Sequence, residues 1–236
     1  MGAALWGLLL VHAACADPVS YTVQIAGVED SALLGLLEGV SDTRALQSEP
    51  PASLIHLRRR AERDLERFRE VFESQGYYAA ETTIEIDREA EPVQVVLHAD
   101  PGAQYRLGEI DVAPAEGIAL AADTGALHEA LGLSSGAPAL AANIAAGNGR
   151  LLTYLRNHGH PAPEIADRRV VVHHADQRVD VSYIVAPGPM AQYGETRPSG
   201  LERVRAKVVL RHVPWQTGDT YDQRQLDVLR RRLYDT

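Results

Sequence analysis

The amino-acid sequence predicts an α+β protein made of tandem β-α-α-β-β units. Amphipathic helical segments are interspersed with segments in which apolar and polar residues alternate, as they do in half-buried strands. This pattern recurs weakly at a spacing of about 85 residues. Gly76 and Gly159 each close a long helix, and Pro101-Gly102 and Pro187-Gly188 each follow the last strand. Tandem copies of one small unit favour scaffolding and partner binding over a single catalytic core.

The first unit is predicted at residues 20–100. Its first strand covers Tyr21–Ile25, a short helix is capped by Asp30 or Ser31, and a long helix begins after Ser53. The apolar residues of the long helix form one stripe, at Leu54, Leu57, Ala61, Leu65, Phe68 and Phe72. Its charged residues are interpreted as a solvated face, from Arg58-Arg59-Arg60 through Glu62, Asp64, Glu66 and Glu70. Two further strands are predicted at Thr82–Asp87 and Val93–Leu97.

The second unit is predicted at residues 101–188 and has the same order of elements. A strand covers Tyr105–Val112, and a short helix covers Thr124–Leu133. The long helix follows Gly136-Ala137-Pro138 and is expected to bury Leu140, Ile144, Leu151 and Leu155. Gly147 and Gly149 are expected to weaken this helix by about 1 kcal/mol each relative to alanine. A hairpin of Arg169–His173 and Val179–Val185 closes the unit.

Residues 189–236 are predicted to begin a third unit. Tyr193-Gly194-Glu195 echoes Leu107-Gly108-Glu109, and Leu201–Leu210 suits a short helix. Leu226, Leu229 and Leu233 start the stripe of a long helix. The two strands that would cover this helix are missing from the sequence, so we expect the chain to be a fragment, or an early-terminated gene product, of a longer protein.

A secretory signal peptide is predicted at residues 1–16. Ala3–Val11 is apolar but too short to cross a bilayer, and Ala14-Cys15-Ala16 suits a cleavage site before Asp17-Pro18. No Lys or Arg precedes the apolar stretch, which leaves open an earlier start or a buried N-terminal helix. Cys15 is the only cysteine, so the mature chain would have no disulfide. A lipoprotein cysteine is the alternative, although no aliphatic residue stands three positions before it.

Composition and motifs argue against several classes of function. The formal net charge of −9, without clustered Lys or Arg, argues against nucleic acid as a partner. His158 and His160 flank a glycine, and His173 and His174 are adjacent in a strand and point to opposite faces, so we expect no metal site. The chain has no Gly-x-Ser-x-Gly motif, and Gly147-Asn148-Gly149 lacks the Lys-Ser/Thr of a phosphate loop. We therefore expect a protein that is not an enzyme and needs no cofactor.

The predicted sheets suggest a binding site instead. A three-stranded sheet covered on one face by two helices leaves two strand edges, whose unpaired N–H and C=O groups can accept an extended segment of another protein. Glu81, Glu85 and Asp87 could instead blunt the edge in the first unit. Both interpretations remain open at this point.

Several of these motifs resemble those of the polypeptide-transport-associated (POTRA) domains of the Omp85 superfamily of outer-membrane assembly factors. The residues concerned are the Gly27 strand end, Gln75-Gly76-Tyr77-Tyr78, Pro101-Gly102-x-x-Tyr105-x-x-Gly108-x-Ile110, Pro187-Gly188 and Leu229-Arg230-Arg231-Arg232-Leu233-Tyr234. Three units directly after a signal are most similar to the TamA branch. The resemblance implies that each unit is a three-stranded sheet covered by two antiparallel helices.

The resemblance also implies a role. Such proteins are periplasmic scaffolds attached to the outer membrane, and their contact with the membrane is made through a C-terminal barrel that this sequence lacks. Expected partners are a TamB-like protein anchored in the inner membrane and nascent outer-membrane proteins, including autotransporters. The binding edge corresponds to Ala80–Asp87, which makes Ala80, Thr82, Ile84 and Ile86 the candidate protein-binding residues. In the second unit His160-Pro161 replaces Tyr77-Tyr78, and proline cannot donate a ladder hydrogen bond, so this edge should be the poorer acceptor.

Other origins are also compatible with the sequence. A general outer-membrane assembly factor usually has five such units, and a two-partner secretion transporter has two. A secreted α+β hydrolase or binding domain would need one compact pocket with convergent polar residues. A periplasmic domain of a division protein would need an anchor helix longer than Ala3–Val11.

Overall fold

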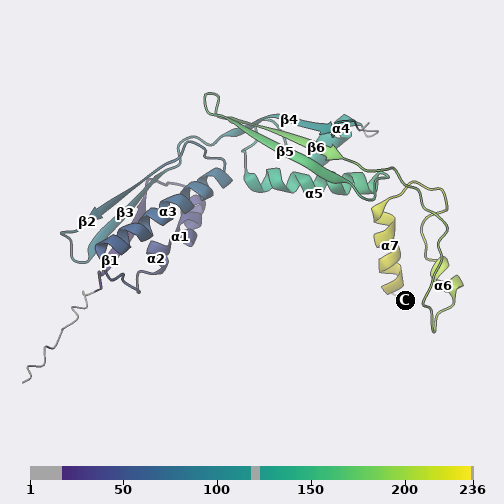
Figure 1. Ribbon diagram of the computed structural model, residues 1–236, viewed down its shortest axis with the longest axis horizontal. Helices are drawn as coiled ribbons and strands as arrows, with labels where there is room; N and C mark the ends of the chain where they lie inside the picture. The colour runs from purple at the N-terminus through teal and green to yellow at the C-terminus, as the bar shows by residue number, and fades with distance from the viewer. Residues whose placement is uncertain (1–17, 118–122, 235–236) are drawn as a thin grey trace, which may run out of the picture. The chain divides into compact units, whose positions relative to one another are not determined.

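The computed structural model describes residues 18–117 and 123–234 (Figure 1). The predicted signal peptide, with Cys15, lies outside them. The chain divides into two compact units. One runs up to Phe72 and resumes at Ala79–Gly102, and the other comprises Glu73–Tyr78 and the chain from Ala103 onward. The α+β class and the repeated β-α-α-β-β order are confirmed.

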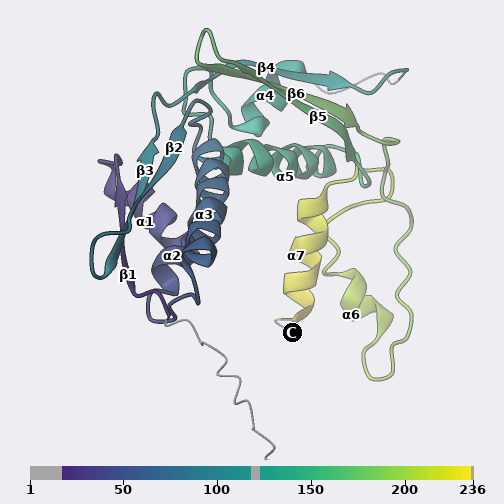
Figure 2. The same ribbon diagram turned by 60° about the vertical axis from the view of Figure 1, so that its left-hand side comes forward.

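The first unit contains one three-stranded sheet and a layer of helices. Its elements are β1 (Tyr21–Ala26), α1 (Ser31–Val40), α2 (Asp42–Ala45), α3 (Leu54–Ser74), β2 (Glu81–Asp87) and β3 (Val93–Asp100). The strand order is β1-β3-β2, with β3 parallel to β1 and antiparallel to β2. Both ribbon views show α3 alongside one face of this sheet (Figures 1 and 2). Leu57, Phe68 and Phe72 of α3 are fully buried, as are Val95 and Leu97 of β3.

One charged residue of α3 contradicts the prediction of a solvated face. Asp64 is fully buried, and its carboxylate accepts hydrogen bonds from Ser41 Oγ (2.8 Å) and from the amides of Asp42 and Thr43 (2.9 Å each). Arg67 Nη1 lies 3.3 Å from the same carboxylate. These donors surround the amino end of α2, a helix that the sequence did not predict. The carboxylate therefore satisfies amides at the start of α2 that have no partner within that helix.

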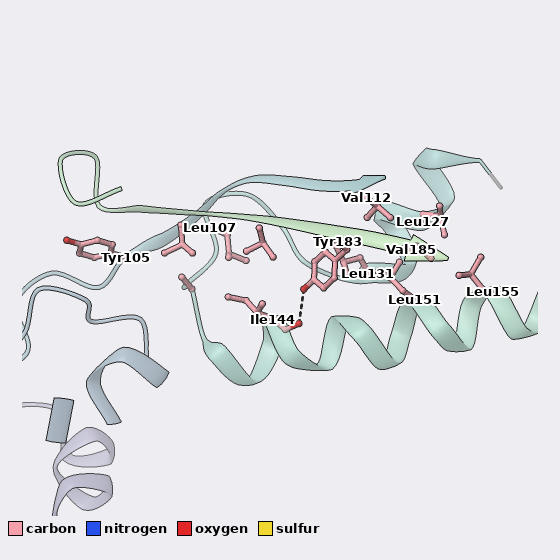
Figure 3. Packing of buried hydrophobic residues seen from close by; sticks show 13 residues of the cluster. Tyr105, Leu107, Val112, Leu127, Leu131, Ile144, Leu151, Leu155, Tyr183 and Val185 are labelled. Atoms are coloured by element: carbon pink, nitrogen blue, oxygen red, sulfur yellow. Dashed lines mark hydrogen bonds between the residues drawn. The ribbon is translucent and has the colours of Figure 1, made fainter. Parts of the chain in front are cut away.

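The second unit repeats the arrangement with β4 (Arg106–Pro114), α4 (Thr124–Leu131), α5 (Ala141–Asn157), β5 (Glu164–His173) and β6 (Arg178–Ala186). Its strand order is β4-β6-β5. Thirteen buried residues form the core between β6 and the helices (Figure 3). Within it the hydroxyl of Tyr183 donates to the carbonyl of Ile144 at 2.7 Å. β5 begins earlier than the predicted Arg169 because Glu164 and Ile165 already pair with β6, across a register shift before Asp167.

Residues 189–234 lie in the second unit and contain α6 (Ala206–Leu210) and α7 (Gln223–Tyr234). α6 is shorter than the predicted Leu201–Leu210 segment, and no residue of α7 is buried. Near Tyr193 the chain forms an isolated bridge between Gln192 and Thr220 in place of a full strand. Within the described residues, this segment contributes no strand to a sheet that could cover α6 and α7.

Two sets of backbone hydrogen bonds in the second unit nevertheless repeat one another. In each set a glycine with positive φ, Gly76 or Gly159, accepts a bond of 2.8 Å from a later amide, that of Tyr105 or Ala191. Three further bonds match in order: Ala139 N–Tyr105 O with Tyr221 N–Ala191 O, Leu107 N–Ala137 O with Tyr193 N–Asp219 O, and Gly136 N–Leu107 O with Gly218 N–Tyr193 O. The weak sequence repeat therefore corresponds to a repeated backbone ladder.

Candidate functional site: the outer edge of the first sheet

β2 is one of the two edge strands of the first sheet, and β1 is the other. The unpaired side of β2 is called the outer edge of this sheet. β2 pairs in continuous register with β3 from Glu81–Asp100 to Asp87–Gln94. No strand among residues 18–117 and 123–234 pairs with its other side. Successive residues of an antiparallel strand point their N–H and C=O groups alternately toward and away from the paired neighbour, so β2 presents a row of unpaired backbone groups.

The side chains of β2 form two rows of different character. Thr82, Ile84 and Ile86 are half-buried on the face toward the helices, opposite the buried residues Ala99, Leu97 and Val95 of β3. The structure thus brings together three of the four predicted binding residues in one row. Ala80 lies one position before β2 and is also half-buried.

The other row is acidic and exposed. Glu81, Glu85 and Asp87 alternate with the apolar row and point away from the helices. His98 of β3 stands opposite Thr83, and its Nε2 lies 3.4 Å from the Glu85 carboxylate. Asp87 accepts a hydrogen bond from the amide of Glu89 in the following turn. Sequence reasoning treated these acids only as residues that blunt the edge. Their position on one face of the same strand makes them part of any surface that this edge presents.

The outer edge of the second sheet differs in both shape and charge. β5 carries a register shift between Ile165 and Asp167, and most of its side chains are exposed, including Val170 at 40%. Its charged residues are two acids and two arginines: Glu164, Asp167, Arg168 and Arg169. The irregular register and Pro161 before the strand make it a less continuous template than β2.

An ion cluster connects the three strands of the second sheet. Asp180 of β6 accepts a hydrogen bond from the Glu109 amide at 2.7 Å, and its carboxylate lies 2.8 Å from His173 Nε2 and 3.0 Å from Arg178 Nε. The bond from Glu109, aided by Arg178 and His173, lowers the pKa of Asp180 against the opposing effect of burial. Gly108 leaves the space that Arg178 fills, because a Cβ there would lie 2.1 Å from Arg178 Cδ.

The four histidines singled out in the sequence each contact a different group. His173 contacts Asp180, whereas His174 Nδ1 lies 3.0 Å from the Tyr105 hydroxyl. His158 stacks on Tyr154, and His160 is buried with Nδ1 3.1 Å from the Gly188 carbonyl oxygen. In the described part of the chain, no three His, Cys, Asp or Glu residues come together as metal ligands.

A shallow hollow of about 510 Å³ lies between α4 and α5. It is lined by Ala130, Ala146, Gly149, Arg150, Thr153, Tyr154 and Asn157. The lining contains no carboxylate or histidine that could act as a general base, so the hollow gives no support to the hydrolase alternative. In the same described ranges, no helix is both long and apolar enough to span a bilayer.

No family model and no curated protein matches the chain. Among solved structures, it is similar to POTRA domains 3–5 of BamA from Haemophilus influenzae, with 17% identity and a TM-score of 0.47 over 92% of this chain and 85% of the other. It is also similar to POTRA domains 1–3 of Omp85 from Anabaena, with 13% identity and a TM-score of 0.44 over 92% and 83%. A third match is the N-terminal domain of Omp85 from Thermosynechococcus elongatus, with 19% identity and a TM-score of 0.40 over 92% and 84%.

Proposed function

We propose that this chain is the periplasmic POTRA region of an outer-membrane assembly factor of the Omp85 superfamily. It acts as a scaffold that binds extended segments of other proteins by strand addition. The observation that carries this proposal is the continuous, unpaired edge of β2 beside a half-buried apolar row. Backbone hydrogen bonds to such an edge provide affinity that depends little on the partner's sequence. The role requires neither a cofactor nor a catalytic residue.

The proposal includes the division into units at residues 20–100, 101–188 and 189–236. The repeated backbone ladder supports a third unit, because the bonds that precede α5 recur before α7. Three units after a secretory signal favour the TamA branch. The partners would then be a TamB-like protein anchored in the inner membrane and nascent outer-membrane proteins such as autotransporters.

Disulfide cross-linking tests the site of strand addition. Thr83 lies on the exposed row of β2, and Cys15 is the only natural cysteine. With Cys15 replaced by serine and Thr83 by cysteine, we expect a ten-residue peptide of alternating Val and Thr that carries one cysteine to cross-link to position 83. Cysteine at Glu62, on the exposed face of α3, serves as the matched control. Equal cross-linking at both positions would mean that the peptide does not recognise the edge.

A pair of proline substitutions tests the backbone mechanism. Thr83 and Ile84 are consecutive, so their amides point in opposite directions, one toward β3 and one outward. Thr83→Pro and Ile84→Pro should therefore differ, because one removes a ladder bond and the other removes only a donor to the partner. Circular dichroism identifies the variant that keeps its fold, and we expect that variant to bind the Val-Thr peptide at least tenfold more weakly. Unchanged binding by the folded variant would exclude β2 as the acceptor strand.

A further inference from the structure

The exposed face of the β2 edge carries a concentrated negative charge. Glu81, Glu85 and Asp87 occupy three of the four outward positions of the strand, and Thr83 occupies the fourth. Within 4 Å, the basic side chain that pairs with these acids among the described residues is His98, whose Nε2 lies 3.4 Å from the Glu85 carboxylate. The Glu85 side chain remains 72% exposed. An added strand would therefore meet carboxylates that are still free to form ion pairs.

The opposite face of the same edge is apolar. Ile84 and Ile86 are half-buried, so apolar surface continues to the margin of the sheet. Side chains of an added strand alternate between the two faces. The Cβ atom of a residue directly opposite a β2 residue lies about 4.5–5.5 Å from the Cβ atom of that residue. One row of the added strand would cover the isoleucines, and the other would stand opposite the acids.

We infer that the β2 edge selects extended segments in which Lys or Arg alternates with apolar residues. The inference rests on the proposed strand addition and specifies the partner's chemistry. Opposite charges across a strand pair are favourable and like charges are unfavourable, so the acidic row disfavours segments with Asp or Glu at these positions.

β5 of the second sheet lacks the charge pattern that would make β2 selective. The four charged residues of β5 balance, with two acids and two arginines. Arg168 stands opposite Tyr183 and Arg169 opposite Ser182, so the two cations lie in different rows. A strand added at β5 would meet neither a continuous acidic row nor a continuous basic one. The β5 edge therefore provides an internal comparison with the same strand topology and no net charge.

Two peptides that differ only in charge test the inference. Both have Val in one row, with Lys in the other row of the first peptide and Glu in that of the second. Fluorescence anisotropy with the full chain should show the Lys peptide binding about tenfold more tightly at low salt, from a few cross-strand ion pairs. The preference should fall to about twofold in 1 M NaCl, where screening acts within about 3 Å.

Charge reversal in the protein supplies the reciprocal test. Glu85→Lys combined with Asp87→Lys should reverse the preference in favour of the Glu peptide. Glu62→Lys combined with Glu66→Lys is the matched control, because both residues lie on the exposed face of α3 and the change in net charge is the same. The control should keep the preference for the Lys peptide.

The outcomes separate this inference from the function on which it rests. If the Val-Thr peptide cross-links at position 83 but the Lys and Glu peptides bind equally well, strand addition stands and charge selection is wrong. If the control reverses the preference as much as the edge variant does, the selection arises from net charge and the inference also fails. If no peptide binds or cross-links at β2, both the function and its selectivity are wrong.

Discussion

The two units share the same order of elements, but their cores contain different polar groups. In each of them a strand tyrosine reaches a carbonyl of the helix layer: Tyr21 donates to Thr43, and Tyr183 donates to Ile144, each at 2.7 Å. The first unit additionally buries the carboxylate of Asp64, whereas the second has a glycine, Gly147, at the contact between its long helix and its sheet. The comparison teaches that one topology accommodates a buried carboxylate where donors surround it, and a close contact between helix and sheet where a glycine leaves room.

The largest effect is expected from removing the buried carboxylate. Asp64→Ala leaves Ser41 Oγ and two backbone amides without their acceptor, so it should destabilise the first unit by about 3–5 kcal/mol. Hydrogen exchange measured residue by residue should show lower protection in β3 and unchanged protection in β6. Glu66→Ala, on the exposed face of the same helix, should change stability by less than about 0.5 kcal/mol. Equal effects of the two substitutions would show that Asp64 does not stabilise α2.

The glycines of α5 provide the matching test in the second unit. A Cβ at Gly147 would lie 2.7 Å from the Tyr183 hydroxyl and 2.8 Å from Leu131 Cδ1, whereas one at Gly149 would meet nothing within 4 Å. Gly147→Ala should therefore destabilise the second unit by about 1–2 kcal/mol, despite the better helix propensity of alanine. Gly149→Ala should stabilise it by up to about 1 kcal/mol. Urea unfolding of both variants checks the sign, and stabilisation by both would mean that the core adapts around position 147.

The two glycines of α5 also show what sequence patterns could and could not predict. Hydrophobic periodicity located the strands and the long helices, because one face of each is buried over many residues. Periodicity treated Gly147 and Gly149 alike, although a side chain at the first would clash with Tyr183 and Leu131 and one at the second would meet nothing within 4 Å. It also placed Asp64 with its exposed neighbours, because the donors that stabilise it come from residues 41–43, more than twenty positions earlier. Periodicity within one helix contains no information about such distant partners.

The candidate site was predictable to a similar extent. The alternation at Thr82–Asp87 predicted a strand with two faces, and the family resemblance indicated that this strand would be the binding edge. The strand order confirms that β2 lies at the edge. The shift in β5 between Ile165 and Asp167 was not predictable, because it depends on pairing with β6. Pro161 already predicted that the second edge would be the poorer acceptor, but its irregular register became visible only in the fold.

A smaller effect is expected from removing the buried tyrosine hydroxyl that each core contains. Tyr183→Phe removes the bond to Ile144 but keeps the buried ring, so it should cost about 0.5–1.5 kcal/mol. Tyr21→Phe should cost more, because the Tyr21 hydroxyl also accepts a hydrogen bond from Arg60 at 3.0 Å. Urea unfolding of the two variants tests this order. Tyr234→Phe, at an exposed position, should have no measurable effect.

The smallest effect concerns the outer faces of the two sheets and depends on pH. The bond from the Glu109 amide, with Arg178 and His173 nearby, lowers the pKa of Asp180 in the folded state. The resulting stability is fully present above the unfolded pKa of about 4 and is lost as pH falls through the lower folded value. Because Asp180 is partly exposed, Asp180→Asn should cost less than about 1 kcal/mol at pH 6, and its difference from the unsubstituted chain should shrink below pH 4. In the first sheet the Glu85–His98 pair is longer and more exposed, so Glu85→Gln should change the stability at pH 6 by only a few tenths of a kcal/mol. An equal loss of stability at pH 6 in the two variants would show that the cluster around Asp180 does not stabilise the second sheet more than the exposed pair stabilises the first.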